Sequence, residues 1–102
     1  MTMQQERDIM ELAERQYGMN TQVVVAIEEL SELIKELTKY LRGNVSYSAL
    51  TEEAADVSIV LDEVIMMFNI RAGVEACREE KLKRLVYRIE EDQRHSVGEV
   101  EP

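Results

Sequence analysis

The chain has 102 residues, which favours a single domain, and 45% of them are apolar, enough to build a core. Its 21 acidic and 12 basic residues give a net charge of −9, which argues against a protein that binds the phosphate backbone of a nucleic acid. The single cysteine excludes a disulfide framework, no apolar run reaches the roughly 20 residues of a membrane span, and the N-terminus lacks a signal-peptide core. We therefore expect a cytoplasmic protein with no membrane contact.

Four helices are predicted, because the only proline is the last residue and apolar residues recur at helical spacing. The first covers residues 4–17 and ends at Gly18. The second covers residues 21–42. Its apolar residues alternate steps of four and three, a seam typical of helical bundles. This seam consists of Val23, Ile27, Leu30, Ile34, Leu37 and Leu41.

The third helix is predicted over residues 49–68, after a short polar loop in which Ser46 or Ser48 is the candidate N-cap. It has a main apolar stripe and a second apolar set on its opposite side. A helix that is apolar on two sides is buried on two sides, and in a domain this small the second neighbour is expected to be another copy of the chain. The main stripe is Leu50, Ala54, Val57, Leu61, Val64 and Phe68; the second set is Ala55, Ile59 and Met66.

The fourth helix is predicted over residues 74–91, and the polar residues 93–102 are expected to form a flexible tail. Residues 1–92 are then one all-α domain. The fold class that follows is a four-helix bundle completed by oligomerisation.

Two acidic residues of the third helix lie in or beside its apolar stripe, where charged side chains are unexpected. At about 100° per residue, Glu53 falls about 40° from Val57, inside the apolar stripe, and Asp56 about 100° from it, on the shoulder. A carboxylate on an apolar face loses water, so Glu53 needs a compensating partner or stays protonated. Because Glu53 and Asp56 are three residues apart, their side chains are neighbours on one surface.

The second helix carries a similar pair, Glu29 and Glu32, in which Glu29 flanks the apolar seam. If the second and third helices pack antiparallel through their short loop, the two pairs converge. Four converging carboxylates repel one another unless a cation lies among them, and ligands that are all oxygen suit Mg²⁺ or Mn²⁺. For any one of these residues the alternative is an ordinary acidic face in contact with water.

Basic residues are candidates for contact with the phosphates of a ligand. With Leu85 at zero, Lys81 falls about 40° away, on the core-facing side of the fourth helix, and Arg84 about 100° away. Lys81 would otherwise neutralise an acid or extend outward to water. Lys39 and Arg42, near the end of the second helix, are weaker candidates, because basic residues are common at helix C-termini.

The pattern E-E-x-x-E followed by E-x-x-D on two helices resembles that of the MazG-like all-α nucleoside triphosphate pyrophosphohydrolases. It comprises the stretch from Glu28 to Glu32 and the stretch from Glu53 to Asp56. The surrounding sequence also resembles that of the family, in the segments AIEELSELIKELTKYLRG, EEAADVSIVLDEV and EEKLKRL. The resemblance covers residues 23–89, and the two motifs together with the trailing K-x-x-R make it fairly specific.

The resemblance implies a MazG-like bundle that works as a homo-oligomer, either dimer or tetramer. It implies hydrolysis of the α–β phosphoanhydride of a nucleoside triphosphate to a monophosphate and pyrophosphate, with Mg²⁺ as cofactor. It also implies a role for each matching residue: Glu29, Glu32, Glu53 and Asp56 would be metal ligands, Glu28 would be an accessory acid, and Lys81 and Arg84 would face the phosphates. Chemical reasoning adds that a carboxylate free of the metal, Glu32 or Glu28, would accept the proton of the attacking water, and that Lys39 is a further candidate for phosphate contact.

One position departs from the family pattern. Many members carry asparagine two residues before the lysine, where this chain has Glu79. Two other functions stay open from the residues alone. The first is a non-catalytic helical interaction module, and the second is a regulator that binds a nucleotide or a divalent ion without turnover.

Overall fold

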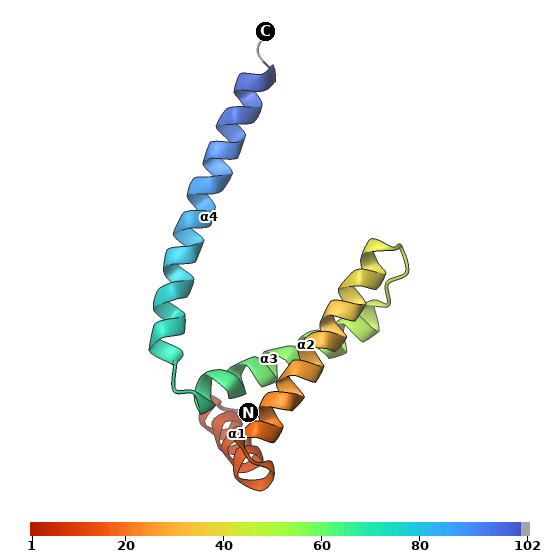
Figure 1. The fold of residues 1–102 in the computed structure, drawn as a ribbon, viewed down its shortest axis with the longest axis vertical. Helices are drawn as coiled ribbons and strands as arrows, with labels where there is room; N and C mark the ends of the chain where they lie inside the picture. Colours follow the sequence, from red (N-terminus) through yellow and green to blue (C-terminus); the bar gives the residue numbers. More distant parts are fainter. Residues whose placement is uncertain (101–102) are drawn as a thin grey trace. The chain divides into compact units, whose positions relative to one another are not determined.

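The computed structural model describes the backbone of residues 1–100 and the side chains of residues 1–96. Within this range the chain forms four helices and no strand, so the all-α prediction is confirmed (Figure 1). The helices are α1 (Met3–Tyr17), α2 (Met19–Leu41), α3 (Tyr47–Met67) and α4 (Arg71–Val100). None of the described helices is long and apolar enough to cross a membrane.

Local signals explain where the first three helices begin and end. Thr2 caps α1 in a capping box, since its hydroxyl accepts from the Gln5 amide at 3.1 Å and its amide donates to the Gln5 side chain at 2.7 Å. Gly18 separates α1 from α2 at φ 89°, a conformation that favours glycine. Ser46, one of the two predicted caps, accepts from the amide of Ala49 at 3.2 Å at the start of α3.

The chain divides into two compact units. The first, Met1–Asn69, holds α1, α2 and α3, and the second begins at Ile70 and consists of α4. The helix α4 continues past Glu91, where the sequence predicts its end, because residues 92–100 contain no proline and Arg94 pairs with Glu91 at 2.8 Å. The single domain over residues 1–92 and the flexibility of the tail stay predictions, and residues 101 and 102 lie outside the described part.

The centre of the first unit is the contact between α2 and α3, with α1 packed against both helices. Few side chains are buried there, and half of the buried ones are polar. Among the described residues, the buried apolar side chains are Ala26, Val60 and Ile65, and the buried polar ones are Gln22, Glu36 and Glu63. The first unit therefore has a small core that includes two carboxylates.

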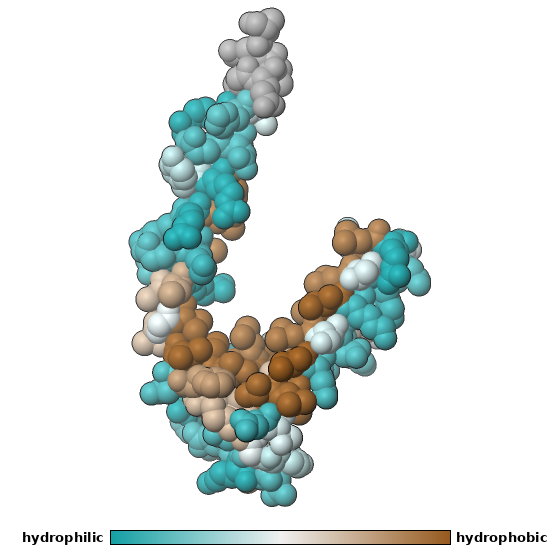
Figure 2. Space-filling view, viewed as in Figure 1, coloured by the Kyte–Doolittle hydropathy of each residue, from teal (hydrophilic) through white to brown (hydrophobic). Residues whose placement is uncertain are grey.

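The predicted apolar seam of α2 does not face α3. The seam lies about 100° around α2 from the buried face, and most of it is exposed, with Ile34 at 64% and Leu41 at 82%. Leu61 and Phe68 of the main α3 stripe are about half exposed as well. Figure 2 shows apolar residues gathered along α2 and α3. The face of α2 that packs against α3 is therefore not the apolar seam that the sequence predicts as typical of a bundle.

Candidate metal centre

Three carboxylates from two helices meet at the contact between α2 and α3. Glu29 comes from α2, and Glu53 and Asp56 come from α3. One oxygen from each of the three lies within 4.8 Å of the others. Glu29 and Glu53 are partly buried and Asp56 is exposed, so the group is open to water on one side.

The helical phase explains why these acids meet. On α3, Glu53 lies about 20° from the buried Val60, and on α2, Glu29 lies about 20° from the buried Gln22. The loop of residues 42–46 reverses the direction of the chain, so α2 and α3 are antiparallel and the faces that carry Glu29 and Glu53 oppose each other. Glu29, which flanks the apolar seam, lies at the middle of the face that contacts α3.

The environment of Glu29 favours its protonated form. Loss of water on burial raises the pKa of Glu29 above its ordinary value, and so do the charges of Asp56, Glu53 and Glu32. A hydrogen bond between the carboxyl groups of Glu29 and Asp56 acts in the same direction. All of these effects disfavour the ionised form of the Glu29 carboxyl group.

The environment of Glu53 also disfavours its ionised form. Burial raises the pKa of Glu53, and the charges of Asp56, Glu32, Glu36 and Glu52 raise it further. Its Oε2 atom is buried and has no hydrogen-bond partner. The prediction that Glu53 lies on a face turned away from water agrees with the burial of this atom.

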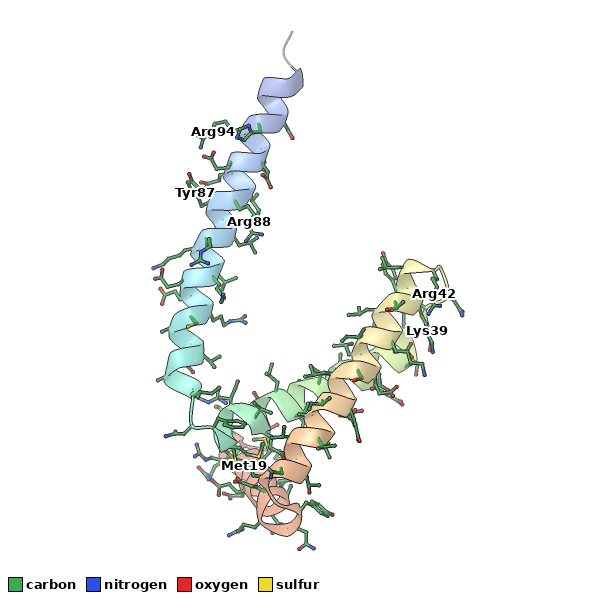
Figure 3. The ribbon with its side chains drawn as sticks, in the orientation of Figure 1. Met19, Lys39, Arg42, Tyr87, Arg88 and Arg94 are labelled. Atoms are coloured by element: carbon green, nitrogen blue, oxygen red, sulfur yellow. The ribbon has the colours of Figure 1, made fainter. Side chains whose placement is uncertain are left out.

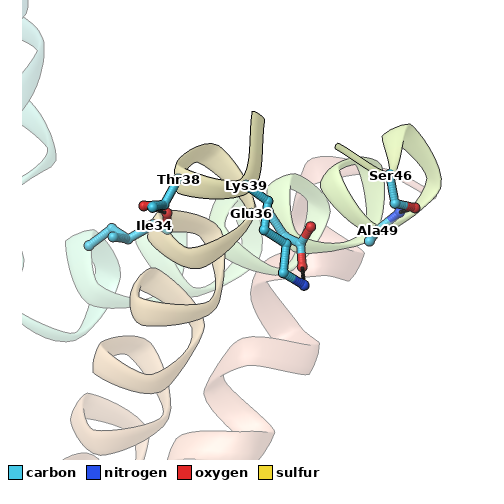
Figure 4. A network of polar contacts seen from close by, with 6 residues as sticks. All are labelled: Ile34, Glu36, Thr38, Lys39, Ser46 and Ala49. Carbon is cyan, nitrogen blue, oxygen red and sulfur yellow. Dashed lines mark hydrogen bonds and ion pairs between the residues drawn. The ribbon is translucent and has the colours of Figure 1, made fainter. Parts of the chain in front are cut away.

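Glu36 is a fourth acid on the same side of α2. Its residue is only 7% exposed, and its Oε1 atom lies 3.1 Å from Nζ of Lys39, one turn further along (Figure 4). Its Oε2 atom is buried and has no hydrogen-bond partner. Lys39, a candidate for phosphate contact, is thus engaged with a carboxylate in this structure.

Of the remaining predicted site residues, Lys39 is partly buried and the others are exposed. Glu28 and Glu32 lie on α2, and the charge of Glu32 reaches both Glu29 and Glu53. Lys39 and Arg42 belong to the same end of α2 (Figure 3).

Lys81 and Arg84 are neighbours on α4, in the second unit, so their contact with phosphates stays a prediction. Glu79, at the position where the family pattern has asparagine, lies on the same helix and is paired with Lys83 at 3.5 Å.

Sequence reasoning missed a second polar contact between α2 and α3. Nε2 of Gln22 donates to Oε1 of Glu63 at 2.7 Å, and both residues are buried. It also left Glu36 out of the site. Gln22 and Glu36 share the phase of Glu29 on α2, and Glu63 shares that of Asp56 on α3, so the signal would have been a helical wheel centred on the acids instead of on the apolar seam.

Comparison of the chain with models of known protein families, with curated proteins and with solved structures gave no match. What the site can do therefore follows from its chemistry. Oxygen ligands at this spacing fit a hard divalent cation such as Mg²⁺, which is typically held by one or two carboxylates and several water molecules. Exposed acidic groups also occur without any ion, so the partial burial and raised pKa of Glu29 and Glu53 are the features that favour one.

Proposed function

We propose that this protein is a Mg²⁺-dependent nucleoside triphosphate pyrophosphohydrolase that cleaves the α–β phosphoanhydride, giving a monophosphate and pyrophosphate. The observation that carries the proposal is the convergence of Glu29, Glu53 and Asp56 from two helices. These are three of the four acids that the resemblance to MazG-like enzymes assigns to the metal. The fourth, Glu32, is close enough to raise the pKa of both glutamates.

The residues divide the chemistry among them. Glu29, Glu53, Asp56 and Glu32 would hold the ion, which would neutralise phosphate charge and make bound water more acidic. Glu32 is exposed, so its carboxylate can accept a proton from water at the open side of the group. Glu28 is the alternative acceptor.

The basic side chains of Lys81, Arg84 and Lys39 would stabilise the negative charge on the phosphates, the main electrostatic demand of phosphoryl chemistry. Lys39 reaches a phosphate only after leaving Glu36.

The proposed enzyme also includes at least one further copy of the chain. The α2 seam is exposed in the single chain, and apolar stripes of this length are normally covered. We propose that a homo-oligomer, a dimer or a tetramer, covers it. The single cysteine suits a reducing compartment, which supports a cytoplasmic location.

The test is a product assay. Purified protein is incubated with each nucleoside and deoxynucleoside triphosphate, with and without Mg²⁺, and the products are separated. We expect monophosphate and pyrophosphate to form only when Mg²⁺ is present. Diphosphate and phosphate would mean cleavage of the β–γ bond and would overturn the assignment. No turnover with any substrate would favour the interaction module or the non-catalytic regulator.

A further inference from the structure

The fourth helix carries an apolar stripe of its own, which is exposed in the single chain. Leu82, Leu85 and Ile89 follow one another in steps of three and four residues, so they lie on one face of α4. Their exposed fractions are 51%, 42% and 47%. A stripe with this spacing is typical of a helix that packs against another helix.

Two residues of opposite charge stand in line with this stripe. Arg78 and Asp92 each lie seven residues from Leu85, which places both within about 20° of its phase on the helix. Both are exposed, and the ion pairs described in α4 use other residues, among them Lys83 and Arg94. A charge on a face that a partner helix covers is unfavourable unless the partner supplies the opposite charge.

The charges of α4 as a whole are divided in the same way. Residues 71–88 contain six basic and three acidic side chains, a net charge of +3. Residues 89–96 contain three acidic and one basic side chain, a net charge of −2 with His95 neutral. A helix with one basic and one acidic part attracts a second copy that runs in the opposite direction and repels one that runs in the same direction.

We propose that α4 is an interaction surface for the α4 of a second copy of the chain, with the two helices antiparallel and Leu85 near the two-fold axis. In this register Arg78 lies opposite the partner's Asp92, and Asp92 lies opposite the partner's Arg78. Each charge in the stripe then meets its opposite. A parallel pair would set Arg78 beside the partner's Arg78, which is repulsive, so the charges select the direction of the pair as well as the partner.

The α4 pair is separate from the apolar seam of α2 and does not depend on the proposed hydrolysis. Lys81 and Arg88 lie at one edge of the stripe, where they approach the partner's Arg88 and Lys81 and weaken the pair. Their long side chains can extend to water, which leaves Lys81 available to a phosphate. Because each helix contributes only three apolar residues, the interface is small, and we expect the α4 pair on its own to have a dissociation constant above about 10 µM.

Cysteine cross-linking of the full chain at about 100 µM tests the pair. The double-cysteine variant combines Cys77→Ser with Val74→Cys and Ser96→Cys, and the two new positions lie eleven residues on either side of Leu85. They are about 33 Å apart along one helix, so a short bifunctional thiol reagent cannot join them within a chain. We expect covalent dimers from the double-cysteine variant. Val74→Cys or Ser96→Cys alone, also with Cys77→Ser, should give none, because an antiparallel pair keeps identical positions equally far apart.

Charge reversal tests the register. Arg78→Glu in the double-cysteine variant should weaken the pair by about tenfold, read from the concentration dependence of cross-linking, because like charges then face each other at two symmetric places. Further addition of Asp92→Arg should restore cross-linking, since the two charges are then exchanged. The matched control is Lys83→Glu, which reverses a charge on the opposite side of α4 and should change little. Circular dichroism verifies that each variant is folded.

Three results would overturn the antiparallel pair. Cross-linking by either single-cysteine variant would mean that the helices are parallel. No cross-linking in the double-cysteine variant would mean that another surface, such as the α2 seam of a second copy, covers the stripe of α4. Equal cross-linking with and without Arg78→Glu would mean that Arg78 does not face the partner's Asp92.

Discussion

Glu53 is held at a position where its charge is unfavourable unless something compensates it. Burial and four neighbouring carboxylates raise its pKa, and one of its oxygens is without a partner. The same conditions favour a bound cation and disfavour the empty, fully ionised site. A residue of this kind is expected to link ion binding, activity and stability, and its replacement tests all three.

We expect Glu53→Gln to lower Mg²⁺-dependent hydrolysis by more than about 100-fold, because loss of even an outer-shell partner of a metal site costs about 10–100-fold. The metal-free variant should melt at the same or a higher temperature than the wild type, because a poorly solvated charge is gone. Thermal melts followed by circular dichroism and the product assay measure the two effects.

The matched control for this variant is Glu75→Gln. It removes one charge from an exposed position on α4 and should change neither quantity. Full activity in Glu53→Gln would contradict the metal-site assignment.

The pH dependence of stability follows from the raised pKa values of Glu29 and Glu53. The unfolded chain releases these protons near the ordinary value of 4.5, and the folded chain releases them at higher pH. Between these values the folded state binds more protons, so the stabilisation is complete below 4.5 and is lost as pH rises through the folded pKa values.

We therefore expect the metal-free protein to melt at a higher temperature near pH 5 than at pH 7. The difference should shrink in Glu53→Gln and persist in Glu75→Gln, which separates the site from the general repulsion of an acidic chain. Melts in a chelator across this range provide the measurement. If the melting temperatures of the two variants changed equally with pH, Glu53 would not be the source of the pH dependence.

At the scale of the helices, the contact between α2 and α3 buries polar as well as apolar side chains. The bond from Gln22 to Glu63 is buried and lies away from the converging acids. Loss of a buried donor leaves its acceptor with the full cost of desolvation, whereas replacement of both partners by apolar groups is close to neutral.

We expect Gln22→Met to destabilise the protein by about 1–3 kcal/mol, because Glu63 is left buried without its donor. The double variant Gln22→Met with Glu63→Met should recover most of this loss. Chemical denaturation of the single and double variants gives the free energies. Equal destabilisation in both would show that the hydrogen bond is not the cause.

The cap of α3 has a smaller effect. Ser46→Ala removes the side chain that accepts from the Ala49 amide and should cost about 1 kcal/mol of unfolding free energy. Ser48→Ala, two residues on and inside the first turn, is the control and should change little. Denaturant titration distinguishes them, and equal losses would contradict the assignment of the cap.

The helices themselves were largely predictable, because Gly18, Ser46 and the regular apolar spacing are local signals. The convergence of Glu29 with Glu53 and Asp56 was predictable too, from spacing and a short loop. The orientation of α2 was not, because a helical wheel shows which residues share a face and not which neighbour covers it. The burial of Glu36 depends on the same orientation, so it became evident only from the packing of α3.

At the scale of the molecule, the exposed seam is the main feature that one chain leaves unexplained. The buried residues of α2 are Gln22, Ala26 and Glu36, so the apolar seam of α2 faces away from α3. Among the described residues, two of the six buried ones are carboxylates while the apolar seam is exposed, which departs from the usual arrangement of a small domain. Association of two copies through their seams would place the apolar residues inside and keep the acids at the α2–α3 contact.

We expect Ile34→Lys to dissociate the oligomer at micromolar concentration, because Ile34 is 64% exposed in the middle of the seam and a charge there would be buried without a partner. The control is Thr21→Lys, which adds the same charge to an exposed position of α2 away from the seam and should leave assembly unchanged. Light scattering coupled to size-exclusion chromatography gives the mass of each. A monomeric wild type, or an oligomer that survives Ile34→Lys, would show that something other than a second seam covers this face.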